Sequence, residues 1–185
     1  MKERPTLKTE RLLLRPFALS DAKRVQLLAG DEAIASTTLN IPHPYEDGMA
    51  EEWIGKHQVG FEKGELCNFA IVVRSSGNLI GAIGLVVNHR HVHGELGYWI
   101  GHHYWNEGYC TEAAREVVRY GFEELGLHRI HAMHLSRNPA SGKVMRKIGM
   151  AYEGCRPQHV SKLDAFEDVD LYGLLEREFR AKLNE

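Results

Sequence analysis

One segment, residues 94–136, constrains the fold of this chain more than any other. Residues 94–101 are predicted to form a strand, 102–110 a loop, 111–125 a helix and 128–136 a second strand. The helix is the clearest in the chain, because its small and apolar side chains repeat on one stripe. A helix between two strands of one sheet is the usual crossover of a parallel pair, so these two strands are expected to run parallel.

Hydrophobic periodicity and capping residues predict further elements on both sides of this unit. Strands are expected at residues 9–17, 68–74, 79–88, 151–156 and 166–176, and helices at 22–28, 46–61 and 139–148. The order β-α-α-β-β-β-α-β-α-β-β predicts an α/β (α+β) fold with a mixed sheet that is antiparallel at first. This order excludes a doubly wound fold and a sandwich.

Size and composition narrow the function classes. The 185 residues hold no repeat, linker or low-complexity tract, so we expect a single domain over residues 1–185 with its core at about 9–178. The 23 basic and 25 acidic side chains give a net charge of −2, which argues against nucleic acid or an anionic membrane as a partner. No apolar run approaches the roughly 18 residues of a membrane span. Three cysteines without a CxxC pair fit a cytoplasmic location better than a disulfide framework or a zinc ribbon.

The junction between the loop and the helix has the chemistry of an anion site. A helix N-terminus offers unpaired amides and the positive end of the helix dipole. Gly108 can adopt a positive φ and turn several N–H groups toward one phosphate. An ordinary turn followed by a helix cap at Thr111 would explain the same residues. The chain contains neither GxxxxGK followed by Ser or Thr nor GxG, so a P-loop and a Rossmann fingerprint are excluded.

The sequence YWNEGYCTEA at residues 104–113 resembles the acetyl-CoA pyrophosphate loop of the GNAT superfamily of N-acetyltransferases. More narrowly, it resembles the branch that contains the bacterial ribosomal-protein N-terminal (alanine/serine) acetyltransferases. Other stretches agree in family order: TERLLLR at 9–15, IPHPY at 41–45 with WI at 53–54, NPAS at 138–141 with KIGM at 147–150, EG at 153–154 and DVDLYG at 168–173. Together these stretches cover nearly the whole chain.

The resemblance implies the acyl-CoA N-acyltransferase fold, a mostly antiparallel mixed sheet with helices on both faces. It implies that acetyl-CoA, the cosubstrate, binds where the parallel strands 94–101 and 128–136 splay apart. Backbone groups of three strand residues would pair with the pantetheine arm: Trp99, Ile100 and Gly101. Amides of the loop and helix start would hold the pyrophosphate: Asn106, Glu107, Gly108, Tyr109, Cys110 and Thr111. The Asn138 amide would bond the pantetheine, and Ser141 would lie near the thioester sulfur.

Several of these positions have simpler explanations or depart from the wider family pattern. Glu107 stands where a basic residue is common, so the backbone rather than side-chain charge would hold the phosphates. Trp105 replaces Arg or Gln and is expected to pack under the loop. Asn138 is fully explained as a helix N-cap followed by proline. The basic cluster Arg137, Lys143, Arg146 and Lys147 is either a solvated face or an attraction for the CoA phosphates.

The implied reaction is direct attack of a neutral amine on the acetyl carbonyl, with a thiolate leaving. Glu95 is the candidate general base, acting through water, although a structural role in the sheet explains it equally well. Ser141 is the candidate that protonates or stabilises the thiolate. At pH 7 an α-amine is about 15% neutral and a lysine amine roughly 0.04%, which favours a protein N-terminus as acceptor. A small-molecule amine acetyltransferase and a non-catalytic acyl-CoA-binding domain remain as alternatives.

Eleven histidines are the one compositional oddity of the chain. His89, His91 and His93 alternate and would share a strand face, but no cysteine or carboxylate completes a ligand set, so no metal site is predicted. His102 and His103 border the loop, where a proton-shuttling role stays open. Apolar edges of the final hairpin leave a homodimer open as well.

Overall fold

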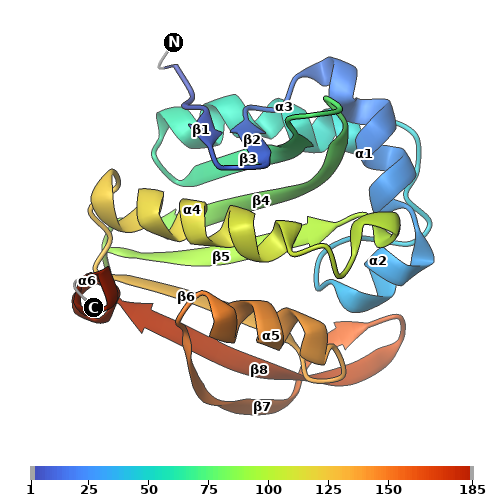
Figure 1. Ribbon diagram of the computed structural model, residues 1–185. Coiled ribbons are helices and arrows are strands. Elements are labelled where there is room, and N and C mark those ends of the chain that lie inside the picture. The colour runs from blue at the N-terminus through green and yellow to red at the C-terminus, as the bar shows by residue number, and fades with distance from the viewer. Residues whose placement is uncertain (1–2, 184–185) are drawn as a thin grey trace.

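A single open sheet of eight strands organises the protein in the computed structural model, which describes residues 3–183 (Figure 1). In sheet order the strands are β1 (Leu7–Lys8), β2 (Leu12–Arg15), β3 (Leu66–Val73), β4 (Leu79–Asn88), β5 (His93–Ile100), β6 (Arg129–Leu135), β8 (Ala165–Leu175) and β7 (Ala151–Lys162). All neighbours are antiparallel except β5 and β6. The mixed, mostly antiparallel sheet expected from the sequence is therefore confirmed.

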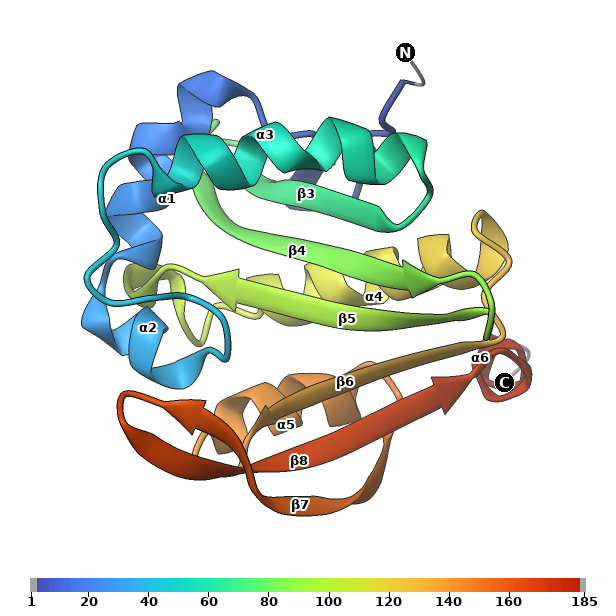
Figure 2. The ribbon, with the colours of Figure 1, turned by 180° about the vertical axis from the view of Figure 1, so that it is seen from behind.

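The one parallel pair is short. β5 and β6 pair only at His93–Arg129, Gly94–Ile130 and Glu95–His131 within the described residues. Both strands continue beyond these pairs, β5 to Ile100 along β4 and β6 to Leu135 along β8. The sheet therefore opens between β5 and β6, and the opening is visible in Figure 2 as the gap between the ribbons of these strands.

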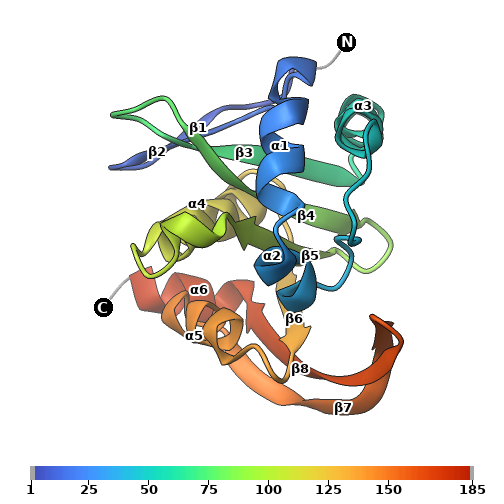
Figure 3. The same cartoon turned by 90° about the vertical axis from the view of Figure 1, so that its right-hand side faces the viewer.

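Helices cover both faces of the sheet, as the side view in Figure 3 shows, and a hydrophobic core lies under the helices of each face. α4 (Tyr109–Glu123) and α5 (Pro139–Lys147) pack on one face, and α1 (Ala22–Ala29) and α3 (Met49–Glu62) pack on the other. Successive side chains of a strand point to opposite faces of the sheet, so β3 contributes to both cores. Phe69 and Ile71 enter the core under α4, while Ala70 and Val72 enter the core under α3.

Five elements among the described residues were not expected from the sequence: β1, α2 (Glu32–Thr37), the C-terminal α6 (Glu176–Leu183) and two 3-10 helices at Leu19–Asp21 and His102–Tyr104. α6 begins at the residue where the last strand was expected to end, and its side chains are mostly charged. Phe179 anchors it by stacking on Phe122 of α4, with 5.0 Å between ring centroids. Elsewhere the boundaries differ by a few residues; α4, for example, begins at Tyr109 instead of residue 111.

No helix among residues 3–183 is both long and apolar enough to cross a bilayer.

Candidate active site

A cavity of about 940 Å³ lies at the opening between β5 and β6. Its walls come from both halves of the chain: β5, the loop before α4, the first turns of α4 and α5, and the segment from α2 to α3. The cavity receives most of the residues expected to bind the cofactor or catalyse: Glu95, Trp99, Ile100, Asn106, Gly108, Tyr109, Cys110, Thr111, Asn138 and Ser141. Some of these ten residues are distant from one another in the chain, and the fold brings all ten to the same cavity.

Gly101 and Glu107 are the two predicted residues that do not line the cavity. The Gly101 N–H donates to the Ile80 carbonyl at 2.8 Å, so it continues the pairing of β5 with β4. The Glu107 carbonyl accepts a hydrogen bond from the Arg11 guanidinium at 3.0 Å, on the side away from the cavity wall.

The loop before α4 has the backbone geometry of an anion cradle. Gly108 caps α4 with φ of +79°, and Asn106 has φ of +65°, so two residues of the loop are left-handed. The amides of Tyr109, Cys110 and Thr111 belong to the first helical turn, where N–H groups have no partner within the helix. Together with the helix dipole they form a site for an anion such as a pyrophosphate.

Trp105 connects this loop to the end of β5. Its indole N–H donates to the Ile100 carbonyl at 2.6 Å, and the ring packs edge-on against His102, with 4.9 Å between centroids. Trp105 is 38% exposed and lines the cavity, so the expectation that it packs under the loop stays a prediction. Because the Ile100 carbonyl is already engaged, it has less capacity to pair with a pantetheine arm.

Ser141 has a partner that sequence reasoning missed. The Tyr98 hydroxyl, on β5, lies 3.0 Å from the Ser141 hydroxyl and donates to the Ser141 carbonyl at 3.0 Å, on α5. Burial raises the pKa of Tyr98 well above its usual range, so the phenol remains a neutral donor. Nothing in the sequence pairs residues 98 and 141; the alternation of β5, which points Tyr98 toward the α4–α5 face, was the one available signal.

Asn138 is confirmed as the N-cap of α5, its side-chain oxygen accepting from the Ser141 N–H at 3.4 Å. Its amide nitrogen donates to the Thr37 carbonyl at 3.1 Å. Both ends of the side chain are thus engaged by the protein itself. The pantetheine contact expected for Asn138 stays a prediction.

The basic cluster at the start of α5 divides into two pairs. Arg137 donates to the Ser36 carbonyl and pairs with Glu167, and Arg146 donates to the Tyr172 hydroxyl. These two arginines are structural. Lys143 and Lys147 line the cavity and are the members of the cluster placed to attract phosphates.

Glu95 is the carboxylate nearest the point where β5 and β6 separate, because its pair with His131 is the last between the two strands. Its side chain lines the cavity and is half-buried. Burial raises the pKa of Glu95 above its ordinary value, although the neighbouring His93 acts in the opposite direction. A raised pKa lies closer to pH 7, and it makes the ionised carboxylate a stronger base.

Cys110 and the histidines show no sign of a metal or redox site. Burial raises the pKa of the Cys110 thiol to about 12, so it is protonated and unreactive at neutral pH. None of the three cysteines forms a disulfide. Within residues 3–183 no group of three or more His, Cys, Asp or Glu side chains is arranged to hold a metal.

Three polar side chains from the second half of the chain hold the segment 36–41, which covers one side of the cavity. Arg137 donates to the Ser36 carbonyl at 2.6 Å, and Asn138 donates to the Thr37 carbonyl. Lys162 of β7 is buried and donates to the Ile41 carbonyl at 2.5 Å. These bonds shape the part of the cavity that lies opposite the α4 loop.

An open, mostly antiparallel sheet with one splayed parallel pair and helices on both faces is the acyl-CoA N-acyltransferase fold. The family profile for the acetyltransferase (GNAT) domain matches residues 11–151. The chain belongs to the GNAT family of acetyltransferases and is an N-acetyltransferase. Enzymes of this family use acetyl-CoA, and relatives with this fold have been solved with CoA or acetyl-CoA.

Individual proteins agree with this assignment. The uncharacterised N-acetyltransferase YnaD of Bacillus subtilis (strain 168) is 33% identical over 172 residues, 92% of this chain and 97% of YnaD. The crystal structure of a GNAT-family acetyltransferase from Bacillus anthracis, 29% identical, aligns with a TM-score of 0.82 over 94% of this chain and 99% of that one. The ribosomal-protein-serine acetyltransferase of Escherichia coli (strain K12) is 30% identical over 78 residues, 42% of this chain and 44% of that protein.

Proposed function

We propose that the protein transfers the acetyl group of acetyl-CoA to the α-amine of a protein N-terminus. The observation that carries this proposal is the balance of charge around the cavity. Its walls contain the carboxylates Glu52 and Glu95 and the cations Lys56, Lys143 and Lys147. Glu52 already pairs with Lys56 at 2.6 Å, which leaves Glu95 as the carboxylate free to meet an amine. One carboxylate suits an acceptor with a single amine better than a polyamine.

The protonation chemistry of the site supports the same acceptor. An α-amine is about 15% neutral at pH 7, whereas a lysine amine is roughly 0.04% neutral. One half-buried carboxylate acting through water is enough for the former and weak for the latter. The resemblance to a ribosomal-protein-serine acetyltransferase adds support. A small-molecule amine with a low pKa is the second candidate.

The proposed mechanism assigns roles to the loop amides, to the strand amides, to Glu95 and to Ser141. The amides from Asn106 to Thr111 hold the pyrophosphate of acetyl-CoA, and strand amides near Trp99 polarise the thioester carbonyl. Glu95 removes a proton from the attacking amine through a water molecule. The amine nitrogen forms a C–N bond to the thioester carbonyl carbon, and the tetrahedral intermediate collapses as the C–S bond breaks. The Ser141 hydroxyl stabilises the leaving thiolate by a hydrogen bond, and the thiolate takes its proton from water. Tyr98 orients Ser141 through their 3.0 Å contact.

A panel of acceptors tests the proposal by thiol release and product mass. The panel contains peptides with a free N-terminus, the same peptides with a blocked N-terminus and an internal lysine, and spermidine. We expect thiol release and one added acetyl group with the first set alone. Acetylation of the blocked peptides or of spermidine at an equal rate would contradict the proposed acceptor.

Three further expectations concern the whole chain and remain proposals. We expect one domain over residues 1–185 with a core at about 9–178, and a cytoplasmic location, which the absence of disulfides among the three cysteines suits.

We also expect a homodimer through the final hairpin, where Tyr152, Leu163 and Phe166 are exposed. Size-exclusion chromatography with light scattering should give twice the chain mass, and Phe166→Glu should restore the monomer.

A further inference from the structure

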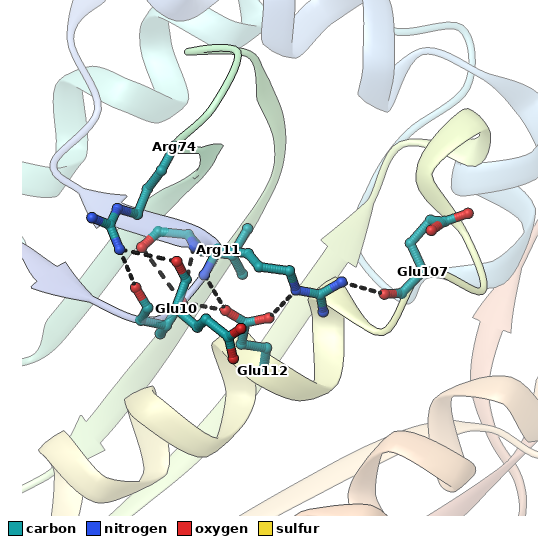
Figure 4. A network of polar contacts seen from close by, with 7 residues as sticks. Glu10, Arg11, Arg74, Glu107 and Glu112 are labelled. Atoms are coloured by element: carbon teal, nitrogen blue, oxygen red, sulfur yellow. Dashed lines mark hydrogen bonds and ion pairs between the residues drawn. The ribbon is translucent and has the colours of Figure 1, made fainter.

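Arg11 lies outside the cavity and contacts the loop before α4, which forms the anion cradle of the cavity. Arg11, immediately before β2, lies more than ninety residues from this loop in the chain and against it in space (Figure 4). Its Nη1 donates to the Glu107 carbonyl at 3.0 Å. The guanidinium carbon also lies 4.6 Å from the centroid of the Tyr109 ring. Arg11 therefore contacts the loop on both sides of Gly108.

The position of Arg11 is itself determined by Glu112, in the first turn of α4. Glu112 accepts from the Arg11 Nε at 2.7 Å and from the Arg11 backbone N–H at 2.8 Å. It also accepts from the Thr9 hydroxyl at 2.5 Å. Burial alone would raise the pKa of Glu112, but these hydrogen bonds outweigh it, and its pKa lies below the ordinary value. The carboxylate is thus ionised and ties β2 to the start of α4.

The contact with Glu107 has a consequence on the opposite side of the loop. In a trans peptide the C=O and the following N–H point in opposite directions. A Glu107 carbonyl held toward Arg11 therefore directs the Gly108 N–H away from Arg11. Gly108 lines the cavity, whereas Arg11 and Glu107 do not; Gly108 also lines a second hollow together with Arg11, so it lies between the two. The hydrogen bond from Arg11 to the Glu107 carbonyl therefore orients the Gly108 N–H, although the Arg11 side chain does not line the cavity.

We propose that Arg11 is a positioning residue for the pyrophosphate of acetyl-CoA, acting by fixing the peptide unit between Glu107 and Gly108. This inference rests on the proposed use of the loop as the pyrophosphate site. It assigns Arg11 an effect on the nucleotide half of the cosubstrate and none on the thioester half, where the chemistry occurs.

The test compares CoA with a cosubstrate that lacks the pyrophosphate. In Arg11→Gln we expect the Kd for CoA, measured by calorimetry, to rise about tenfold, the loss of one charged hydrogen bond. We expect the Kd for S-acetylpantetheine, measured in the same way, to stay within twofold of the wild type. Arg74→Gln is the matched control, because Arg74 donates to the Thr9 and Glu10 carbonyls of the same network and not to the loop.

A second variant separates positioning from direct attraction of phosphate by the Arg11 charge. Glu112→Gln removes a negative charge and weakens the hold on Arg11. Positioning predicts weaker CoA binding in this variant, and direct attraction predicts tighter binding. Tighter binding, an unchanged Kd in Arg11→Gln, or an equal loss with S-acetylpantetheine would each overturn the inference. Because CoA binding is measured without an acceptor, an absence of amine acetylation would refute the proposed function and leave this test intact.

Discussion

At the scale of single residues, the hydroxyls of Ser141 and Tyr98 lie 3.0 Å apart, and we propose that Ser141 acts in turnover. Replacing Ser141 by Ala removes the hydroxyl proposed to assist the leaving thiolate while leaving the α5 backbone in place. We expect kcat to fall at least tenfold and the Kd for CoA to change less than threefold. Ser136→Ala is a suitable control, because its hydroxyl bonds Asp170. An unchanged kcat in Ser141→Ala would remove Ser141 from the mechanism.

The raised pKa of Glu95 gives a second prediction at this scale, for the pH dependence of turnover. A general base works in its ionised form, so kcat is lost as pH falls through the carboxyl pKa. Because burial raises that pKa, the acid limb of kcat measured at saturating amine should lie above the ordinary carboxyl value of 4.5. Glu95→Gln should lower kcat and abolish the limb. Persistence of the same limb in the variant would assign it to another group.

Among the elements, the turn into α4 is the one whose backbone cannot accept an ordinary side chain. Gly108 has φ of +79°, a conformation that is strained for a β-branched residue by about 1–3 kcal/mol. Gly108→Val should therefore distort the cradle and weaken CoA binding at least tenfold. Gly77→Val is the control: Gly77 has φ of +71° in the turn between β3 and β4 and carries comparable strain away from the cavity. Calorimetry should find loss of binding in the first variant and normal binding in the second.

Elements with strong local patterns were predictable, and those without were not. The stripe of small and apolar residues in α4 and the alternation of Phe69, Ile71 and Val73 in β3 each repeat long enough to identify the element. α2 has six residues and α6 is largely charged, so neither presents an apolar face that a periodicity could reveal. Both depend on contacts with distant parts of the chain, such as Phe179 against Phe122.

In the candidate site too, the part with a local sequence pattern could be predicted and the long-range contacts could not. The loop from Asn106 to Thr111 is continuous in the chain and could be predicted with its glycine and helix start. The contact of Tyr98 with Ser141, and that of Arg11 with Glu107, join segments brought together only by the sheet order. No local signal marks such pairs, because strand register and helix packing determine them.

At the scale of the whole molecule, the cavity is closed by bonds between the first and second halves of the chain. Lys162 donates to the Ile41 carbonyl, and replacing it by Met keeps the apolar stem while releasing the segment 36–41. We expect KM for the amine to rise about fivefold, with the Kd for CoA within twofold, because the segment lies opposite the α4 loop. Lys182→Met is the control, since Lys182 makes the same kind of bond to the Gly149 carbonyl on α6's side of the molecule. A rise in the Kd for CoA without a change in the KM for the amine would contradict the proposed effect of Lys162 on amine binding.

The separation of β5 from β6 also gives the sheet a third edge, located in its interior. Rows of unpaired backbone groups are usually confined to outer strands, where they invite pairing with other chains and aggregation. Among the described residues, β5 and β6 make no backbone pairs with each other beyond Glu95 and His131, although the Ile100 carbonyl accepts from the Trp105 indole. Acetyl-CoA bound at the opening, as we propose, would cover this inner edge. We expect CoA to delay heat-induced light scattering by the protein, because the bound cosubstrate would shield the inner edge from self-association.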